Sequence, residues 1–152
     1  MERVHHAGLT VDSLDRSIRF YAGTLGAKLL YRRRSETQGV PLTEFQSVVG
    51  VRRAKLEFAF LGFGETLIEL ICYESPRGVK LAPRHNDVGT PHIAFQVSDA
   101  DGTYSKLSRK GVTFLHPPVT VSARPNTWKK GWKFTYSRGP DGELLEIFQE
   151  LS

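Results

Sequence analysis

The sequence is poor in cysteine and has no long apolar run. Cys72 is the only cysteine in 152 residues, so the chain cannot form an internal disulfide, and a disulfide-stapled secreted scaffold is excluded. No apolar stretch approaches the roughly 20 residues that a membrane-spanning helix needs, and the first residues lack the charged and then apolar order of a secretory signal. We therefore expect a cytoplasmic protein without membrane attachment.

The composition is that of an ordinary globular domain. Hydrophobic residues make up 39% of the chain and charged residues 24%, which fits neither disorder nor a coiled coil nor collagen. A chain of this length buries about 70% of its unfolded surface, enough for one domain with a sizeable core.

The chain is basic. Its 21 lysines and arginines exceed its 16 aspartates and glutamates, which gives a net charge of +5 with neutral histidines. Acidic residues separate the positive clusters and no recognition helix or RNA motif accompanies them, so we expect no nucleic-acid partner. The excess would suit an anionic small-molecule substrate. The clusters are Arg32, Arg33 and Arg34; Arg52, Arg53 and Lys55; and Lys129, Lys130 and Lys133.

Two stretches of the chain follow one pattern. Residues 3–30 and 90–115 each begin with an alternation of apolar and other residues, at 6–11 and 92–97, which predicts a strand. A capping residue follows, and then an amphipathic helix that ends at a glycine. The candidate caps are Asp12 or Ser13 and Ser98 or Asp99; the apolar helix positions are Leu14, Ile18, Tyr21 and Leu25, then Ala100, Tyr104 and Leu107; the glycines are Gly26 and Gly111.

Three more strands are expected after each helix. The order βαβββ, given twice, predicts an α+β fold in which modules at about 3–74 and 90–150 form a cup-shaped, half-open barrel within a single domain, 1–152. Residues 75–91, rich in proline and glycine, form the connector. The expected strands are 27–34, 55–62 and 66–73 in the first half, and 112–115, 132–137 and 144–149 in the second.

Strand alternation places a histidine and a glutamate from each half in matching positions. His6 and His92 lie opposite the apolar face of their strands, which each helix must cover, so both are expected to point into the cup. Glu69 and Glu146 interrupt apolar runs, LIEL and LLEI, where a carboxylate is costly unless it is paired or binds metal. Two imidazoles and two carboxylates suit a divalent first-row metal with open positions for substrate oxygens.

The motifs VHHAGLTVDSLDRSIRFYAGTLG, GTPHIAFQVSD and GPDGELLEIFQ resemble the vicinal oxygen chelate superfamily. This family includes glyoxalase I, methylmalonyl-CoA epimerase, extradiol dioxygenases, and fosfomycin and bleomycin resistance proteins. The resemblance implies the same ligands, His6, Glu69, His92 and Glu146, for a divalent ion whose identity (Ni, Zn, Co, Mn, Fe or Mg) is open. It makes His5, expected on the opposite face, the less suitable ligand. The family often has an aspartate where Gly139 precedes the Pro-Asp-Gly turn.

The acidic residue at position 69 is a feature in which this sequence resembles the glyoxalase I and epimerase branch of the family. This resemblance implies a metal-dependent lyase or isomerase that removes a proton next to a carbonyl or thioester and stabilises the resulting enediolate or enolate. The base would be Glu146 or Glu69 by likeness to glyoxalase I, or Glu57 by likeness to the epimerases, although Glu57 could instead be a solvent-facing strand acid. The alternatives are an antibiotic-type binding or resistance protein and a single-chain extradiol-type dioxygenase.

The sequence leaves the substrate, the assembly and the identity of the base open. Residues 35–53, with Glu44, Phe45, Val48 and Val49 at helical spacing, exceed the expected glyoxalase pattern. The family resemblance implies a homodimer whose four ligands come from one chain or from two. Alternation also places Trp132, Phe134 and Tyr136 on one strand face, where they either pack the core or stack on substrate. Residues 117–130 either cover the cup or form a surface loop; they include Pro117, Pro118, Arg124, Trp128, Lys129 and Lys130.

Overall fold

The computed structural model describes residues 2–37, 39–122 and 130–151. The chain divides into two compact units, Met1–Lys80 and Leu81–Ser152, and the boundary falls within the expected connector, 75–91. In the described ranges, every helix is too short or too polar to cross a membrane.

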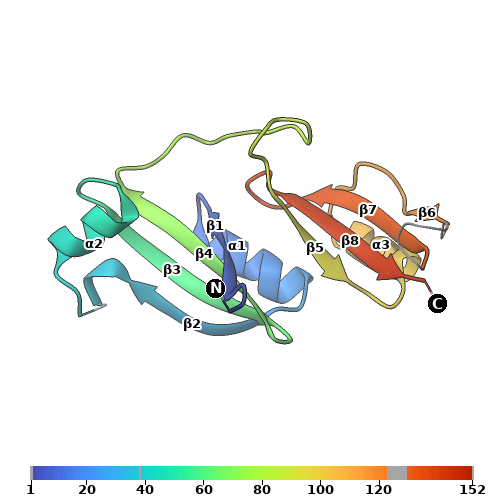
Figure 1. The fold of residues 1–152 in the computed structure, drawn as a ribbon, viewed down its shortest axis with the longest axis horizontal. Helices are drawn as coiled ribbons and strands as arrows, with labels where there is room; N and C mark the ends of the chain where they lie inside the picture. Colours follow the sequence, from blue (N-terminus) through green and yellow to red (C-terminus); the bar gives the residue numbers. More distant parts are fainter. Residues whose placement is uncertain (1, 38, 123–129, 152) are drawn as a thin grey trace. The chain divides into compact units, whose positions relative to one another are not determined.

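The first unit is a four-stranded mixed sheet with helices (Figure 1). Its strands run in the order β1-β4-β3-β2, in which β1 is parallel to β4 and the other neighbours are antiparallel. The elements in chain order are β1 (His6–Thr10), α1 (Leu14–Ile18), the π-helical turn η1 (Arg19–Thr24), β2 (Lys28–Arg34), the 3-10 turn η2 (Ser35–Thr37), α2 (Leu42–Val49), β3 (Lys55–Phe63) and β4 (Thr66–Ser75).

The second unit has the same topology. Its sheet order is β5-β8-β7-β6, again with a parallel first pair and antiparallel neighbours, so the internal repeat expected from the sequence is confirmed. The elements are β5 (His92–Gln96), α3 (Ala100–Arg109), β6 (Val119–Val121), β7 (Trp132–Arg138) and β8 (Leu144–Glu150).

The starts of α1 and α3 are fixed by side-chain caps at equivalent positions. Of the two candidates in each half, Ser13 caps α1 by accepting from the amide of Arg16, and Asp99 caps α3 by accepting from the amide of Gly102. The first helix widens into η1 before it ends at Gly26, whose φ of +91° favours a residue without a Cβ.

Helix α1 covers one face of the first sheet and α3 covers one face of the second, and each covered face carries the core of its unit. Strands β1 and β5 follow the predicted alternation: their apolar side chains point toward the core, and His6 and His92 are exposed. Buried apolar side chains of these cores include Val11, Leu14, Tyr21, Ala59, Leu61, Ile68 and Leu70 in the first unit, and Ala100, Leu107, Leu145 and Ile147 in the second. The opposite face of each sheet is therefore free of helix and carries the candidate ligands.

One expected strand is wrong. Residues 112–115 form only an isolated bridge, from Phe114 to Ser137, and the edge strand that pairs with β7 is β6, which begins at Val119. Pro117 and Pro118 explain the break, because neither residue has an amide N–H to continue the ladder.

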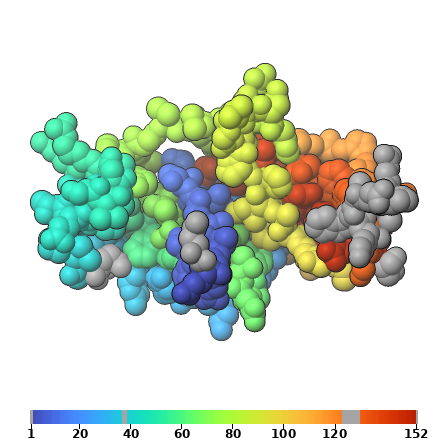
Figure 2. Space-filling model, in the orientation of Figure 1, coloured from blue at the N-terminus to red at the C-terminus, as the bar shows by residue number. Residues whose placement is uncertain are grey.

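The first unit also contains a helix that the second lacks among its described residues. The helical spacing at 44–49 is confirmed by α2, which ends at Gly50 with φ of +68°. In the space-filling view, α2 and the residues that follow β4 lie at the surface (Figure 2).

Candidate metal centre

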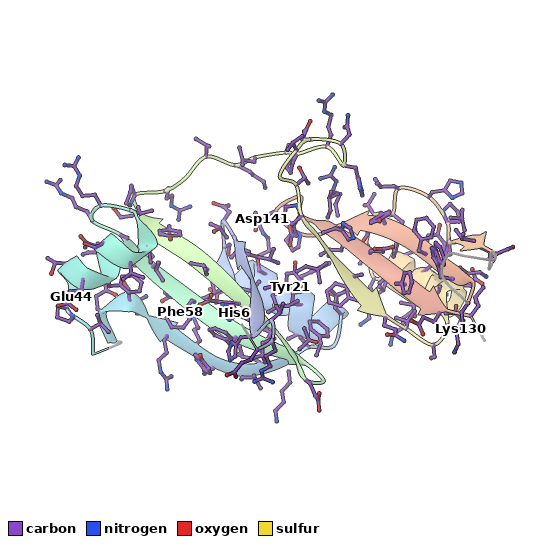
Figure 3. All side chains as sticks on the ribbon, viewed as in Figure 1. His6, Tyr21, Glu44, Phe58, Lys130 and Asp141 are labelled. Carbon is purple, nitrogen blue, oxygen red and sulfur yellow. The ribbon has the colours of Figure 1, made fainter. Side chains whose placement is uncertain are left out.

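His6 and Glu69 form a close pair on the helix-free face of the first sheet. Register places Glu69 beside Gly8, two residues after His6 on the same face of β1. The His6 Nε2 atom lies 3.2 Å from Glu69 Oε2. A Cβ at Gly8 would lie 3.8 Å from that carboxylate oxygen, in ordinary van der Waals contact with it. Figure 3 labels His6 on this sheet.

His92 and Glu146 form the equivalent pair in the second unit. Glu146 lies beside Ala94, and His92 Nε2 lies 3.2 Å from Glu146 Oε2. The two pairs therefore have the same donors and the same spacing on repeated strands. The Glu146 side chain is 10% exposed and that of Glu69 is 19% exposed, so the second carboxylate is more deeply buried.

An aromatic ring stands behind each pair, but only one ring carries a hydroxyl. Phe60 pairs with Glu69 across the strands, as Tyr136 pairs with Glu146. Each ring meets its histidine edge to face, with centroids 5.1 Å apart at His6 and 5.6 Å apart at His92. The Tyr136 hydroxyl donates a hydrogen bond to Glu146, a contact that Phe60 cannot make.

The second pair also has a distinct electrostatic environment. Burial raises the pKa of the Glu146 carboxyl, against smaller lowering effects from His92, Tyr136 and His85. Burial and the charge of Glu146 raise the pKa of the Tyr136 hydroxyl, which keeps it a donor. His85, from the connector, packs edge to face on Tyr136 with centroids 4.5 Å apart. No motif in the sequence marks His85 as a site residue.

Strand alternation predicted that His5 lies on the face of the sheet opposite His6, but the structure places the two histidines side by side. The ring centroid of His5 lies 5.2 Å from that of His6 and 6.5 Å from that of Phe60, and its Nδ1 is 2.9 Å from His6 Nδ1. The expectation is wrong because β1 begins at His6, so His5 is not bound by strand alternation. The contact occupies one ring nitrogen of His6 and leaves Nε2 toward Glu69.

Glu57 lies on the other face of the sheet from His6 and Glu69. It pairs with Cys72, three positions along β3 from Phe60, and is only 7% exposed, so it is not a solvent-facing acid either. Its carboxylate accepts hydrogen bonds from Arg32 and Arg34 on β2, with Arg34 Nε 2.6 Å from Oε1. These arginines hold the pKa of Glu57 below its ordinary value, which opposes a role as a base.

The turn before Glu146 explains the glycine at position 139. The Glu143 carboxylate folds back to accept from the amide of Asp141 at 2.8 Å, and a Cβ at Gly139 would overlap this side chain. Glu143 thus supplies the local hydrogen bonding of the Pro-Asp-Gly turn. Gly142, with φ of +90°, completes it.

The predicted aromatic face of β7 carries the second pair. Trp132, Phe134 and Tyr136 lie on the same face as Glu146. Of the predicted loop, Arg124, Trp128 and Lys129 lie outside the described residues. A pocket of about 420 Å³ opens beyond the end of β5 and is lined by Gln96, Val97, Ser98, Lys130, Glu150 and Leu151.

Each pair alone is too small to hold a metal firmly. Within residues 2–37, 39–122 and 130–151, no group of three or more histidine, cysteine, aspartate or glutamate side chains is placed to hold a metal ion. Protein sites for first-row metals usually supply three or four ligands, and each pair supplies one imidazole and one carboxylate. The donor chemistry of each pair fits a divalent ion, but each pair by itself offers only two donors.

Comparison with known proteins identifies the family. The model of the Glyoxalase/Bleomycin resistance protein/Dioxygenase superfamily matches residues 3–147. The chain therefore belongs to this superfamily, and the resemblance seen in the sequence motifs is confirmed.

Individual relatives include enzymes. The chain is 31% identical to a 2-epi-5-epi-valiolone epimerase from an Actinomyces species, over 95% of this chain and 77% of the relative. It is 30% identical to a probable lactoylglutathione lyase of Vibrio cholerae, over 97% of this chain and 90% of the relative. A glyoxalase family protein from Bacillus cereus has the same α+β fold, with a TM-score of 0.79 and 23% identity over 100% of this chain and 96% of that one.

Proposed function

We propose that the chain is a metal-dependent lyase or isomerase of the glyoxalase and epimerase type. The observation that carries this proposal is the repeated histidine–glutamate pair, with 3.2 Å between Nε2 and Oε2 in both units. The similarity to an epimerase and to a probable lyase supports the same reaction class.

The four side chains of the two pairs would hold one divalent ion, supplied by one chain or by two chains of a homodimer. When bound, such an ion supplies positive charge that stabilises an oxyanion on a substrate with neighbouring oxygens. His6 and His92 would serve through Nε2. His5 occupies the other nitrogen of the His6 ring and so fixes its orientation.

A carboxylate of one pair would take the proton from the carbon next to the substrate carbonyl. Glu146 and Glu69 lie on the helix-free faces and are candidates for this step, whereas Glu57 is held by two arginines on the opposite face. Burial raises the pKa of Glu146, which makes its carboxylate a stronger proton acceptor. Tyr136 would hold this carboxylate in place through its hydroxyl.

Solvent hydrogen exchange tests the proposal directly. The purified protein, loaded in turn with Ni²⁺, Mn²⁺, Co²⁺ or Zn²⁺, is incubated in D₂O with 2-oxo thiohemiacetals, acyl-CoA thioesters and 2-epi-5-epi-valiolone. We expect deuterium to enter one of these compounds, and the His92→Ala variant to abolish the exchange. Binding of a compound without exchange by any loaded form would favour the non-catalytic binding protein and overturn the enzymatic proposal.

A further inference from the structure

Three consecutive arginines on β2 face alternate sides of the first sheet. Arg32 and Arg34 pair across the strands with Ala59 and Glu57, on the helix-covered face. Arg33 pairs with Phe58, on the face that carries His6 and Glu69. A single strand therefore sends two cations to one side and one cation to the other.

The two arginines on the helix-covered face are neutralised by carboxylates. Arg32 bonds Glu57 and lies 2.6 Å from Asp15, and Arg34 bonds Glu57 and lies 3.5 Å from Glu74. Arg33 has no such partner among the described residues. It donates to the carbonyl of Arg32 at 3.0 Å, and its guanidinium carbon lies 5.9 Å from the centre of the Tyr31 ring.

A continuous set of rings connects Arg33 to the candidate metal pair. Tyr31 stacks on Phe60 with centroids 5.1 Å apart and an interplanar angle of 25°, and Phe60 touches the His6 ring. Phe58 meets both Tyr31 and Phe60 edge to face. Figure 3 labels Phe58 and His6 within this unit.

A bulge in β2 adds an apolar side chain to the same face. The register shifts between Leu29 and Tyr31, so Leu30 is the extra residue. Its side chain lies over Gly62, where a Cβ would be 3.6 Å from the Leu30 methyl carbon. Leu30 and Tyr31, two successive residues, thus both face the ring cluster. Both are more than 40% exposed, at 45% and 42%.

We propose that Arg33 and Tyr31 form a subsite for an anionic group of the substrate, with the ring or chain that carries this group packed on Tyr31 and Leu30. The identification of the bound compound as a substrate rests on the proposed function. The prediction that this subsite binds an anionic group does not depend on the proposed function. A guanidinium with four remaining N–H donors matches a carboxylate, phosphate or sulfonate, and the adjacent aromatic face matches an apolar or planar skeleton. The substrate class is then an anionic carbonyl compound rather than a neutral one.

Binding of a paired set of probes tests the subsite without turnover. Naphthalene-2-sulfonate and the uncharged 2-naphthol are titrated at pH 7 into the full chain, followed by two-dimensional NMR. We expect the sulfonate to bind about fivefold more tightly, the effect of one exposed charge contact near 1 kcal/mol. The shifted amide signals should include those of Tyr31, Arg33 and Phe58.

Two variants distinguish the effect of the Arg33 side chain on binding from the effect of the protein's net charge. Arg33→Gln should reduce the preference for the sulfonate to less than twofold and leave 2-naphthol binding unchanged. Arg52→Gln removes the same charge from an exposed turn between α2 and β3 and should retain the preference. Equal binding of the two probes to wild type, signals shifted elsewhere, or an unchanged preference in Arg33→Gln would each overturn the subsite. A subsite that binds while the metal-loaded protein catalyses no exchange would instead refute the proposed function alone.

Discussion

Replacing Glu57 by glutamine separates a structural ion pair from a catalytic base. The exchange keeps the side-chain shape and removes the charge that Arg32 and Arg34 contact. Hydrogen bonds to charged groups contribute about 1.5–3 kcal/mol each, but the arginine side chains are 41% and 61% exposed and both keep a second carboxylate. We therefore expect the free energy of unfolding to fall by about 2 kcal/mol in total, or about 4–8 °C in Tm.

Urea denaturation at pH 7 measures this loss. The control is Glu65→Gln, in the exposed turn between β3 and β4. We expect this control to change the free energy of unfolding by less than about 0.5 kcal/mol. The folded-state pKa of Glu57 is lowered from 4.5, so its contribution is complete above that value. This contribution is lost as the pH falls through the lower folded-state pKa. The unfolding free energies of wild type and Glu57→Gln should then converge. If Glu57→Gln keeps the stability of wild type but no longer catalyses deuterium entry into the substrate, the ion-pair role is refuted and Glu57 is again a candidate base.

Three further predictions concern the two half-sites and the fold. Tyr136→Phe should weaken Mn²⁺ binding about tenfold in calorimetry by releasing Glu146, while Phe60→Tyr should not weaken it; equal affinities of wild type and Tyr136→Phe would contradict this role. Asp99→Ala should cost about 1 kcal/mol of unfolding free energy by removing the α3 cap, and an unchanged urea midpoint would argue against that cap. Mixed dimers of His6→Ala and His92→Ala should recover Mn²⁺ binding at half the sites if the ligands come from two chains, and none if all come from one chain.

The strand alternation and the internal repeat were sufficient to select one histidine and one glutamate in each half, but not to predict the 3.2 Å contact between them. A side-chain period of two fixes which residues share a face, and a hydrophobic core on one face fixes which side is left for His6 and His92. The equivalent positions of Glu69 and Glu146 then follow from the repeat, without knowledge of the strand register.

Features that depend on register or on chain ends were not predictable. The orientation of His5 is set outside the strand, and the pairing of Glu57 with two arginines requires the register of β2 after its bulge. Alternation grouped Tyr136 with Trp132 and Phe134 but left open whether they face the core or the substrate, and the hydrogen bond from Tyr136 to Glu146 needs the cross-strand register. Pro117 and Pro118 were visible as breakers, yet their displacement of the edge strand to Val119–Val121 depends on pairing with β7.

We expect one divalent ion to require the histidine and glutamate of both repeats. Calorimetric titration of the metal-free protein with Mn²⁺, for wild type, His6→Ala and His92→Ala, measures this requirement. We expect one ion per chain in wild type and a loss of affinity of at least about 100-fold in each variant, more than the loss of an outer partner costs. Mn²⁺ binding that is absent in wild type, or that survives unchanged in either variant, would contradict it.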